Sequence, residues 1–314
     1  MNAIKVIFMG TPDFSVPVLK MLIDNYNVIG VVTQTDKPVG RKGELKASPV
    51  KEVALYHSIP VYQPIKIRKE YQEIVDLNPD IIITCAYGQI IPKEILDAPR
   101  LGCINVHASL LPRHRGGAPI HHAIIDGDNK TGATIMYMDV GMDTGDIITS
   151  QEIDILDSDT CESLFDKLSI LGSNLLKDIL PSIIDGTNTR TKQDESLATI
   201  SNNIKPEDEI IDFNKSRREV FNQIRGLNSW PVAYTFLDHK RFKVWLSKEG
   251  NDILTGKPVG TIINVYKDGI GVQVNDGEII LTEIQPEGKK KMPASAYLNG
   301  INKDELKGKV FGEV

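Results

Sequence analysis

Short apolar runs alternate with longer amphipathic segments over the first half of the chain. Between the first two runs, Ser15 can cap a helix that has Pro17 in its first turn and buries Val18, Leu19 and Leu22 on one face. Strands that alternate with helices in this way predict an α/β fold with a doubly wound, mostly parallel sheet. The predicted strands are residues 4–9, 28–33, 80–85, 103–107 and 134–138.

A long amphipathic helix is expected after the apolar run at 147–155. Asp159, with Glu162 three residues later, resembles a capping box, and leucines and isoleucines follow at helical spacing to residue 179. We expect this helix to close the first domain near Pro181, so the first domain is predicted to cover residues 1–187.

The chain then becomes polar, which predicts a linker over 188–207 and a second domain over 208–314. This second domain begins with a short helix near 217–225. Strand-like runs follow, separated by Asp-Gly turns at 268–269 and 276–277, and short strands at such spacing predict a small β-barrel of the oligonucleotide-binding (OB) type. The runs are 242–246, 260–265, 271–274 and 279–283.

Composition restricts the classes of protein. The 314 residues are 41% apolar and 25% charged, as in an ordinary globular chain, and the net charge of -6 argues against broad, non-specific binding of nucleic acid. Three cysteines without a Cys-x-x-Cys pair predict buried thiols in a reducing compartment. Every apolar run is far shorter than the roughly 20 residues that cross a bilayer, and the N-terminus resembles a first strand, so we expect a cytoplasmic protein.

Polar side chains gather at the predicted carboxyl ends of the strands, where open α/β sheets bind their ligands. The turn after the first strand lacks the Gly-x-Gly-x-x-Gly pattern of a dinucleotide site. Asn105 and His107 alternate along one strand and therefore share a face. A lone histidine at a strand end is more often structural, but a rigid stretch with Pro112 follows directly, and Asp143 lies among glycines after another strand. These residues predict an active site.

The set Asn105-x-His107, Ser109-Leu110-Leu111-Pro112 and Asp143 resembles the active site of the 10-formyltetrahydrofolate-dependent formyltransferases, whose catalytic domain is Rossmann-like. The resemblance extends from residues 8–14 to 228–231 and is to the members that formylate methionyl-tRNA. It implies attack of the methionyl amine on the formyl carbon, without a metal. The Asn105 amide and a protonated His107 would stabilise the developing oxyanion, and Asp143 would orient the imidazole and help to move protons.

The same resemblance implies where each substrate binds. The pterin ring of 10-formyltetrahydrofolate would contact the segments around residues 87–91 and 140–143, and a basic loop at 36–46 would engage the acceptor end of initiator methionyl-tRNA, with Arg41 as its chief contact. The expected folate contacts are Tyr87, Gly88, Gln89, Ile90, Ile91, Ser109, Leu110, Leu111, Pro112 and Val140, and the expected tRNA contacts are Lys37, Arg41, Lys42 and Lys46.

Two alternatives use the same residues differently. A folate-dependent formyltransferase acting on an amino-sugar nucleotide or on a purine precursor would share the three polar side chains but has little use for the basic loop, which would then be an ordinary surface loop. A non-catalytic RNA-binding protein built on the barrel predicts aromatic stacking residues and no intact set of Asn105, His107 and Asp143. The flexible, glycine-containing basic loop favours tRNA.

Overall fold

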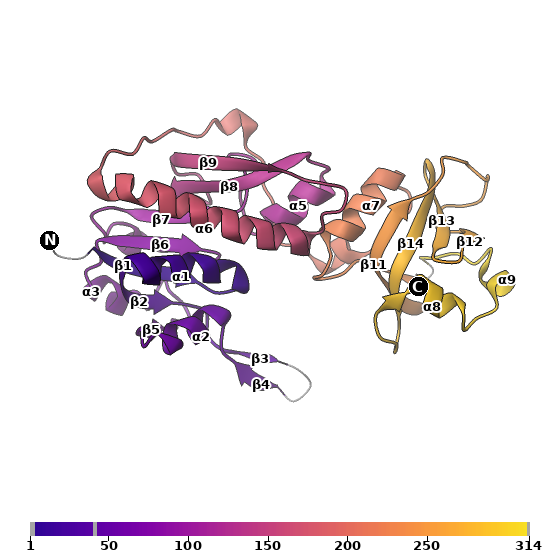
Figure 1. Ribbon diagram of the computed structural model, residues 1–314, viewed down its shortest axis with the longest axis horizontal. Coiled ribbons are helices and arrows are strands. Elements are labelled where there is room, and N and C mark those ends of the chain that lie inside the picture. Colours follow the sequence, from indigo (N-terminus) through magenta and orange to yellow (C-terminus); the bar gives the residue numbers. More distant parts are fainter. Residues whose placement is uncertain (1–3, 40–42, 313–314) are drawn as a thin grey trace. The chain divides into compact units, whose positions relative to one another are not determined.

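The computed structural model describes residues 4–39 and 43–312, and its first sheet has seven strands (Figure 1). The spatial order is β5-β2-β1-β6-β7-β8-β9, in which neighbours from β5 to β7 are parallel and β8 and β9 are antiparallel. This confirms the predicted, mostly parallel sheet. The strands are β1 (Lys5–Gly10), β2 (Asn27–Val32), β5 (Val61–Tyr62), β6 (Ile81–Cys85), β7 (Cys103–His107), β8 (Lys130–Tyr137) and β9 (Ile147–Asp154).

The centre of this sheet is apolar because it is covered on both faces. All five residues of β6 are buried, which explains its nearly continuous apolar sequence. Because β1, β6 and β7 run parallel, their carboxyl ends meet at one edge of the sheet. The helices of this part are α1 (Val16–Asn25), α2 (Pro49–Tyr56), α3 (Gln72–Asp76), α4 (Lys93–Leu96) and α6 (Cys161–Asp185).

Helix α6 lies along the same face of the sheet as α1 (Figure 1). The Ser169 hydroxyl donates to the carbonyl oxygen of Phe14 at 2.8 Å. A Cβ on Gly172 would lie 2.6 Å from Cγ1 of Val106, so the glycine lets the helix approach β7 closely. The helix therefore packs directly on the strand that ends at His107.

Two details of α6 differ from the prediction. The reciprocal cap is formed by Thr160 and Ser163, whose hydroxyls accept from each other's backbone N–H groups at 3.2 and 3.1 Å. Asp159 instead accepts from the backbone of residue 156. The helix also continues through Pro181 to residue 185, because Leu180 and Ile183 are buried on either side of the proline.

The C-terminal part is built on a six-stranded antiparallel sheet, as its runs of short strands predict. Helix α7 (Arg217–Gly226) begins at a true capping box, formed by Ser216 and Glu219, and its apolar face packs into the core of this sheet. The strands are β10 (Tyr234–Leu237), β11 (Lys240–Glu249), β12 (Ile262–Val265), β13 (Ile270–Val274), β14 (Gly277–Pro286) and β15 (Met292–Pro293), followed by α8 (Ala294–Leu298) and α9 (Lys303–Leu306).

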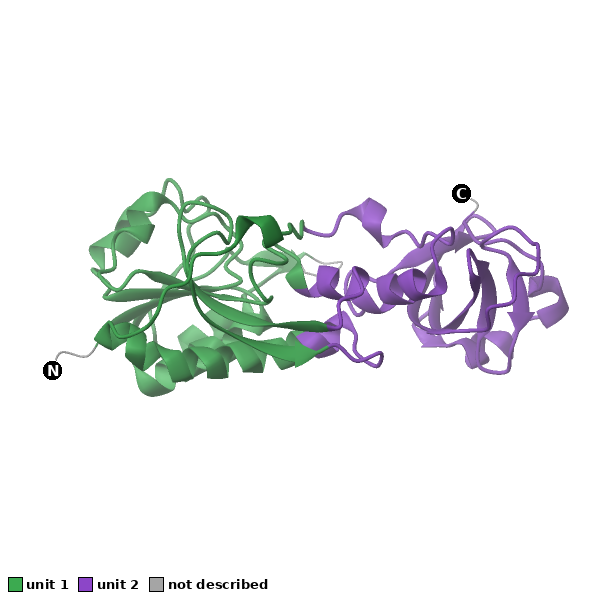
Figure 2. Cartoon of the chain, turned by 90° about the horizontal axis from the view of Figure 1, so that it is seen from above, with its two compact units in different colours: residues 1–119, 130–154, 165–202 green, residues 120–129, 155–164, 203–314 purple. Residues whose placement is uncertain are grey.

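The chain forms two compact units, each of which is built from three separate ranges of the sequence (Figure 2). The first contains residues 1–119, 130–154 and 165–202, and the second contains 120–129, 155–164 and 203–314. The second unit thus includes most of α5 (Pro119–Ile125) and the start of α6. Much of the polar stretch expected as a linker is bonded to the first unit, as in the backbone pairing of Thr191 with Ile147.

No helix in the described ranges is both long and apolar enough to cross a membrane.

Candidate active site

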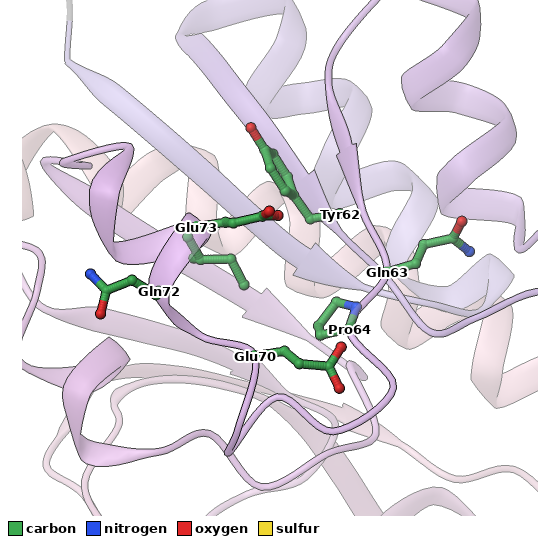
Figure 3. Close-up of a pocket in the computed structure, with 7 residues that line it drawn as sticks. Tyr62, Gln63, Pro64, Glu70, Gln72 and Glu73 are labelled. Carbon is green, nitrogen blue, oxygen red and sulfur yellow. The ribbon is translucent and has the colours of Figure 1, made fainter.

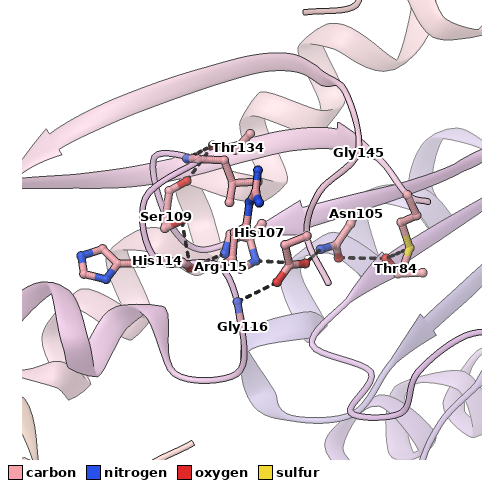
Figure 4. Close-up of polar contacts among 12 residues, drawn as sticks. Thr84, Asn105, His107, Ser109, His114, Arg115, Gly116, Thr134 and Gly145 are labelled. Carbon is pink, nitrogen blue, oxygen red and sulfur yellow. Dashed lines mark hydrogen bonds and ion pairs between the residues drawn. The ribbon is translucent and has the colours of Figure 1, made fainter. Parts of the chain in front are cut away.

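Strand β7 presents Asn105 and His107 at the carboxyl edge of the sheet (Figure 4). On the neighbouring β6, the Thr84 hydroxyl donates to Oδ1 of Asn105 at 2.8 Å. This bond fixes the orientation of the amide, whose Nδ2 then lies 3.5 Å from Oδ1 of Asp143. Thr84 was missed by the sequence analysis, although its position in a buried apolar strand was a usable signal.

The imidazole of His107 is nearly buried, with 7% of its side chain exposed. Its Nε2 lies 2.9 Å from the carbonyl oxygen of His114. Because a carbonyl can only accept, Nε2 carries a proton. The other nitrogen, Nδ1, lies 3.7 Å from Oδ1 of Asp143 and is the ring atom that faces the carboxylate.

Asp143 lies in the loop after β8, with its backbone in the left-handed region at a φ of +55°. Oδ2 of its carboxylate accepts from the backbone N–H of Gly116 at 2.8 Å. Oδ1 is the atom that both Asn105 and His107 approach. The structure therefore brings together the three side chains that the sequence predicts to be catalytic.

Residues 109–116 form a turn that supports His107 rather than an exposed arm. Ser109 is buried, and its hydroxyl donates to the carbonyl oxygen of Arg113 at 2.7 Å. The Thr134 hydroxyl on β8 donates to the backbone oxygen of Ser109. Leu111 is buried and precedes Pro112 through a cis peptide bond, whereas Leu110 is half-buried. The turn places the carbonyl of His114 against the imidazole.

The segment 87–91 offers a mixed surface. Tyr87 is buried, burial raises the pKa of its phenol, and its hydroxyl has no hydrogen-bond partner in the structure. Gln89 is engaged internally, since its side chain bonds the backbone of residues 64 and 67. Ile91 is buried, whereas Gly88 and Ile90 are exposed, the latter by 66%. Val140, in the loop before Asp143, is 76% exposed.

A hollow of about 320 Å³ lies elsewhere, at the β5 edge of the sheet (Figure 3). One of its carboxylates, that of Glu70, accepts from the backbone N–H groups of residues 65 and 66. In the sheet, β2, β1 and β6 separate β5 from β7, so this hollow is distinct from the cluster around His107. It is lined by Tyr62, Gln63, Pro64, Glu70, Gln72, Glu73 and Ile74.

The basic loop expected at 36–46 is in part a β-hairpin. Strands β3 (Lys37–Val39) and β4 (Glu44–Lys46) pair so that Lys37 lies opposite Lys46. A further cation close in sequence, Lys51, lies in α2 and forms an ion pair of 2.7 Å with Asp36. The predicted contacts Arg41 and Lys42 fall outside the described residues.

The three cysteines are free and buried, as predicted, and burial raises the pKa of Cys85, Cys103 and Cys161 to about 12 in each case. Such thiols are inert as nucleophiles near neutral pH. Over 4–39 and 43–312, no group of three His, Cys, Asp or Glu side chains could hold a metal ion.

An amide, an imidazole and a carboxylate at the edge of an α/β sheet are suited to acyl transfer. The sequence matches the formyl transferase family over residues 3–180 and the C-terminal formyl transferase domain over 203–302, and the chain belongs to this family. It is 52% identical to the methionyl-tRNA formyltransferase of Bacillus subtilis over 95% of both chains. It is 53% identical to that of Bacillus mycoides over 98% of this chain and 99% of the relative.

Solved structures share the fold. The N-formyltransferase from Helicobacter canadensis, in complex with folinic acid and dTDP-3-aminofucose, superposes with a TM-score of 0.68 at 22% identity. The match covers 90% of this chain and 99% of that one. At this identity the likeness concerns architecture alone.

Proposed function

We propose that the protein transfers the formyl group of 10-formyltetrahydrofolate to the free amino group of methionine on initiator methionyl-tRNA, which yields formylmethionyl-tRNA for translation initiation in the cytoplasm. The observation that carries this proposal is the near full-length identity to methionyl-tRNA formyltransferases. The sugar-nucleotide alternative is not favoured, because two formyltransferases of known structure whose complexes contain sugar nucleotides or their nucleotide part share the fold at only 22% identity.

The chemistry follows from the cluster. The methionyl amine attacks the formyl carbon, a C–N bond forms, and the carbonyl oxygen becomes an oxyanion. When this oxyanion collapses back to a carbonyl, the bond between the formyl carbon and the folate nitrogen breaks. Nε2 of His107 donates to a backbone carbonyl, so the N–H donors for this oxyanion are Nδ1 of His107, with the ring in its doubly protonated form, and the Nδ2 group of Asn105. Asp143 orients both groups, and through a bound water it takes the proton that the amine loses and passes it to the departing folate nitrogen.

The folate donor is expected to contact the segments 87–91 and 140–143. Exposed Ile90 and Val140 offer apolar surface for a ring, and backbone at Gly88 is open to close approach. The buried hydroxyl of Tyr87, which has no hydrogen-bond partner among the described residues, is a further polar group in this segment. Ser109, Leu110, Leu111 and Pro112 would act mainly by shaping the turn, since Ser109 and Leu111 are buried.

The tRNA contact is expected at the hairpin. Lys37 and Lys46 are paired across it, and Arg41 and Lys42 lie between them in the sequence. In a chain of net charge -6, such a local group of cations is the kind of surface that can hold phosphates.

An assay with two acceptors, each given alone, tests the proposed reaction. The purified protein is given 10-formyltetrahydrofolate with methionyl initiator tRNA and, separately, with an amino-sugar nucleotide. We expect formyl transfer to the tRNA and none above background to the sugar. Transfer to the sugar alone would overturn the assignment of the acceptor, and transfer to neither would overturn the proposed activity.

The hairpin is tested with Arg41→Ala and Arg41→Lys. Loss of a bidentate guanidinium contact is expected to weaken use of methionyl-tRNA by about 1–3 kcal/mol while the affinity for folate is unchanged. Arg41→Lys should retain only part of the wild-type activity on methionyl-tRNA, because an ammonium group keeps the charge but not the planar, bidentate geometry of the guanidinium. Full restoration by lysine, with the difference erased by added salt, would show a purely electrostatic role.

A further inference from the structure

We propose that Gln193, together with the buried guanidinium of Arg115, is a positioning residue for formyl transfer that holds the Asp143 loop in its reactive conformation. Gln193 lies in the polar stretch that the sequence predicts to be a linker. This inference rests on the proposed function.

The Gln193 side chain uses both ends of its amide. Nε2 donates to the backbone oxygen of Asp143 and to that of Gly145, each at 2.8 Å. Oε1 accepts from Nε of Arg115 at 3.0 Å and from Nη2 at 2.9 Å. One side chain therefore connects the loop that carries the carboxylate to the turn that carries Arg115.

The backbone of this loop needs such support. Asp143 has a φ of +55°, a region that non-glycine residues adopt at a cost. At Gly145 an added Cβ would collide with the backbone oxygen of Tyr137, so the chain passes very close to the end of β8. Two carbonyls in an unusual conformation converge on a single amide, and that convergence fixes the direction of the Asp143 side chain.

Arg115 supports the carboxylate indirectly, through its neighbour Gly116. Its side chain is only 4% exposed and forms a bidentate pair with Glu195, with distances of 2.9 and 2.8 Å. Its backbone also pairs with the polar stretch, accepting from Ser201 N at 2.7 Å. The next residue, Gly116, donates its N–H to Oδ2 of Asp143. Gln193 and Arg115 thus brace Asp143 from its backbone and from its carboxylate.

Two variants of Gln193 test this role. Gln193→Ala removes the whole bridge. Gln193→Glu keeps an acceptor for Arg115 but replaces both N–H donors, so it remains informative if the alanine variant fails to fold. Lys192→Ala, at an exposed neighbouring residue, is the matched control. Since a misplacement of about 1 Å can cost on the order of 100-fold in rate, we expect both Gln193 variants to lower kcat about 10- to 100-fold. KM for tRNA and folate should stay within about 2-fold, and the control should match wild type.

A double-mutant cycle separates positioning from a general structural effect. If Gln193 acts through Asp143, Gln193→Ala should cost less than about 3-fold when it is added to Asp143→Ala. A cost as large as in the wild-type background, or an effect on KM alone, would overturn the inference, as would wild-type kcat in folded Gln193→Glu. Absence of formyl transfer by the wild type would instead overturn the proposed function.

Discussion

Gly116→Ala probes the backbone that supports Asp143. Gly116 has a φ of +113°, where an L side chain is strained, and an added Cβ would lie 2.7 Å from the backbone oxygen of Ser201. That oxygen cannot retreat freely, because it accepts from the N–H of Ala118 at 3.2 Å. Ordinary van der Waals contact begins near 3.4 Å, so the two segments must separate by at least about 0.7 Å.

Gly116→Ala is expected to lower both the free energy of unfolding and the rate of formyl transfer. Backbone strain of this kind is worth about 1–3 kcal/mol, which should appear as a lower free energy of unfolding in urea. The displacement also moves the N–H that binds Oδ2 of Asp143, so kcat for formyl transfer should fall about 10- to 100-fold. Gly117→Ala, at the exposed next residue, is the control and should change the free energy by less than about 0.5 kcal/mol. Equal stability and turnover in the two variants would refute this account.

Three further outcomes are expected. Asn105→Ala and His107→Ala should each lower kcat about 100- to 1,000-fold with the tRNA KM unchanged, and normal turnover in His107→Ala would exclude the proposed mechanism. Glu278→Leu should lower the free energy of unfolding by about 1–3 kcal/mol, because buried Glu278 accepts hydrogen bonds from Asn251, Asn264 and Tyr266. Glu278→Gln should lower this free energy by less, because it keeps one acceptor oxygen. The backbone N–H of Lys5, and then the guanidinium of Arg100, lower the pKa of Asp80 by hydrogen bonding to its carboxylate. The stabilisation that the Asp80 carboxylate gives to the folded state should therefore be present at pH 7 and lost as the pH falls through the folded-state pKa. Urea unfolding of Asp80→Asn and wild type should therefore converge in acid, and a constant difference across pH would contradict this.

The sequence was sufficient for five of the seven strands of the first sheet because each of these is a short apolar run bounded by polar residues, whereas the two-residue strand β5 carries no such signal. It was also sufficient to pair Asn105 with His107, since side chains alternate along a strand. The sequence prediction was wrong at the start of α6, where two different caps were equally consistent with the residues. Asp159 and Thr160 are both good cap residues, and only the hydrogen bonds of Ser163 decide between them.

The polar stretch between the predicted domains shows the same limit more clearly. Its composition is that of a linker, and periodicity carries no signal there. In the structure, Gln193 and Ser201 bond the turn and the loop around Asp143, which lie far away in the sequence. A single sequence cannot reveal such pairings, because a polar residue that bonds a distant backbone looks the same as one that bonds water.

The sequence alone determined the α/β fold and the antiparallel second sheet, because these depend on local periodicity, and the resemblance to a known family singled out the three polar side chains. Only the tertiary structure decided how those side chains are held. Thr84 orients the amide, the carbonyl of His114 fixes the proton on Nε2, and Gln193 braces the loop. Each of these contacts joins segments that come together only in the folded protein. The geometry of the contacts depends on backbone conformations that no local sequence pattern specifies.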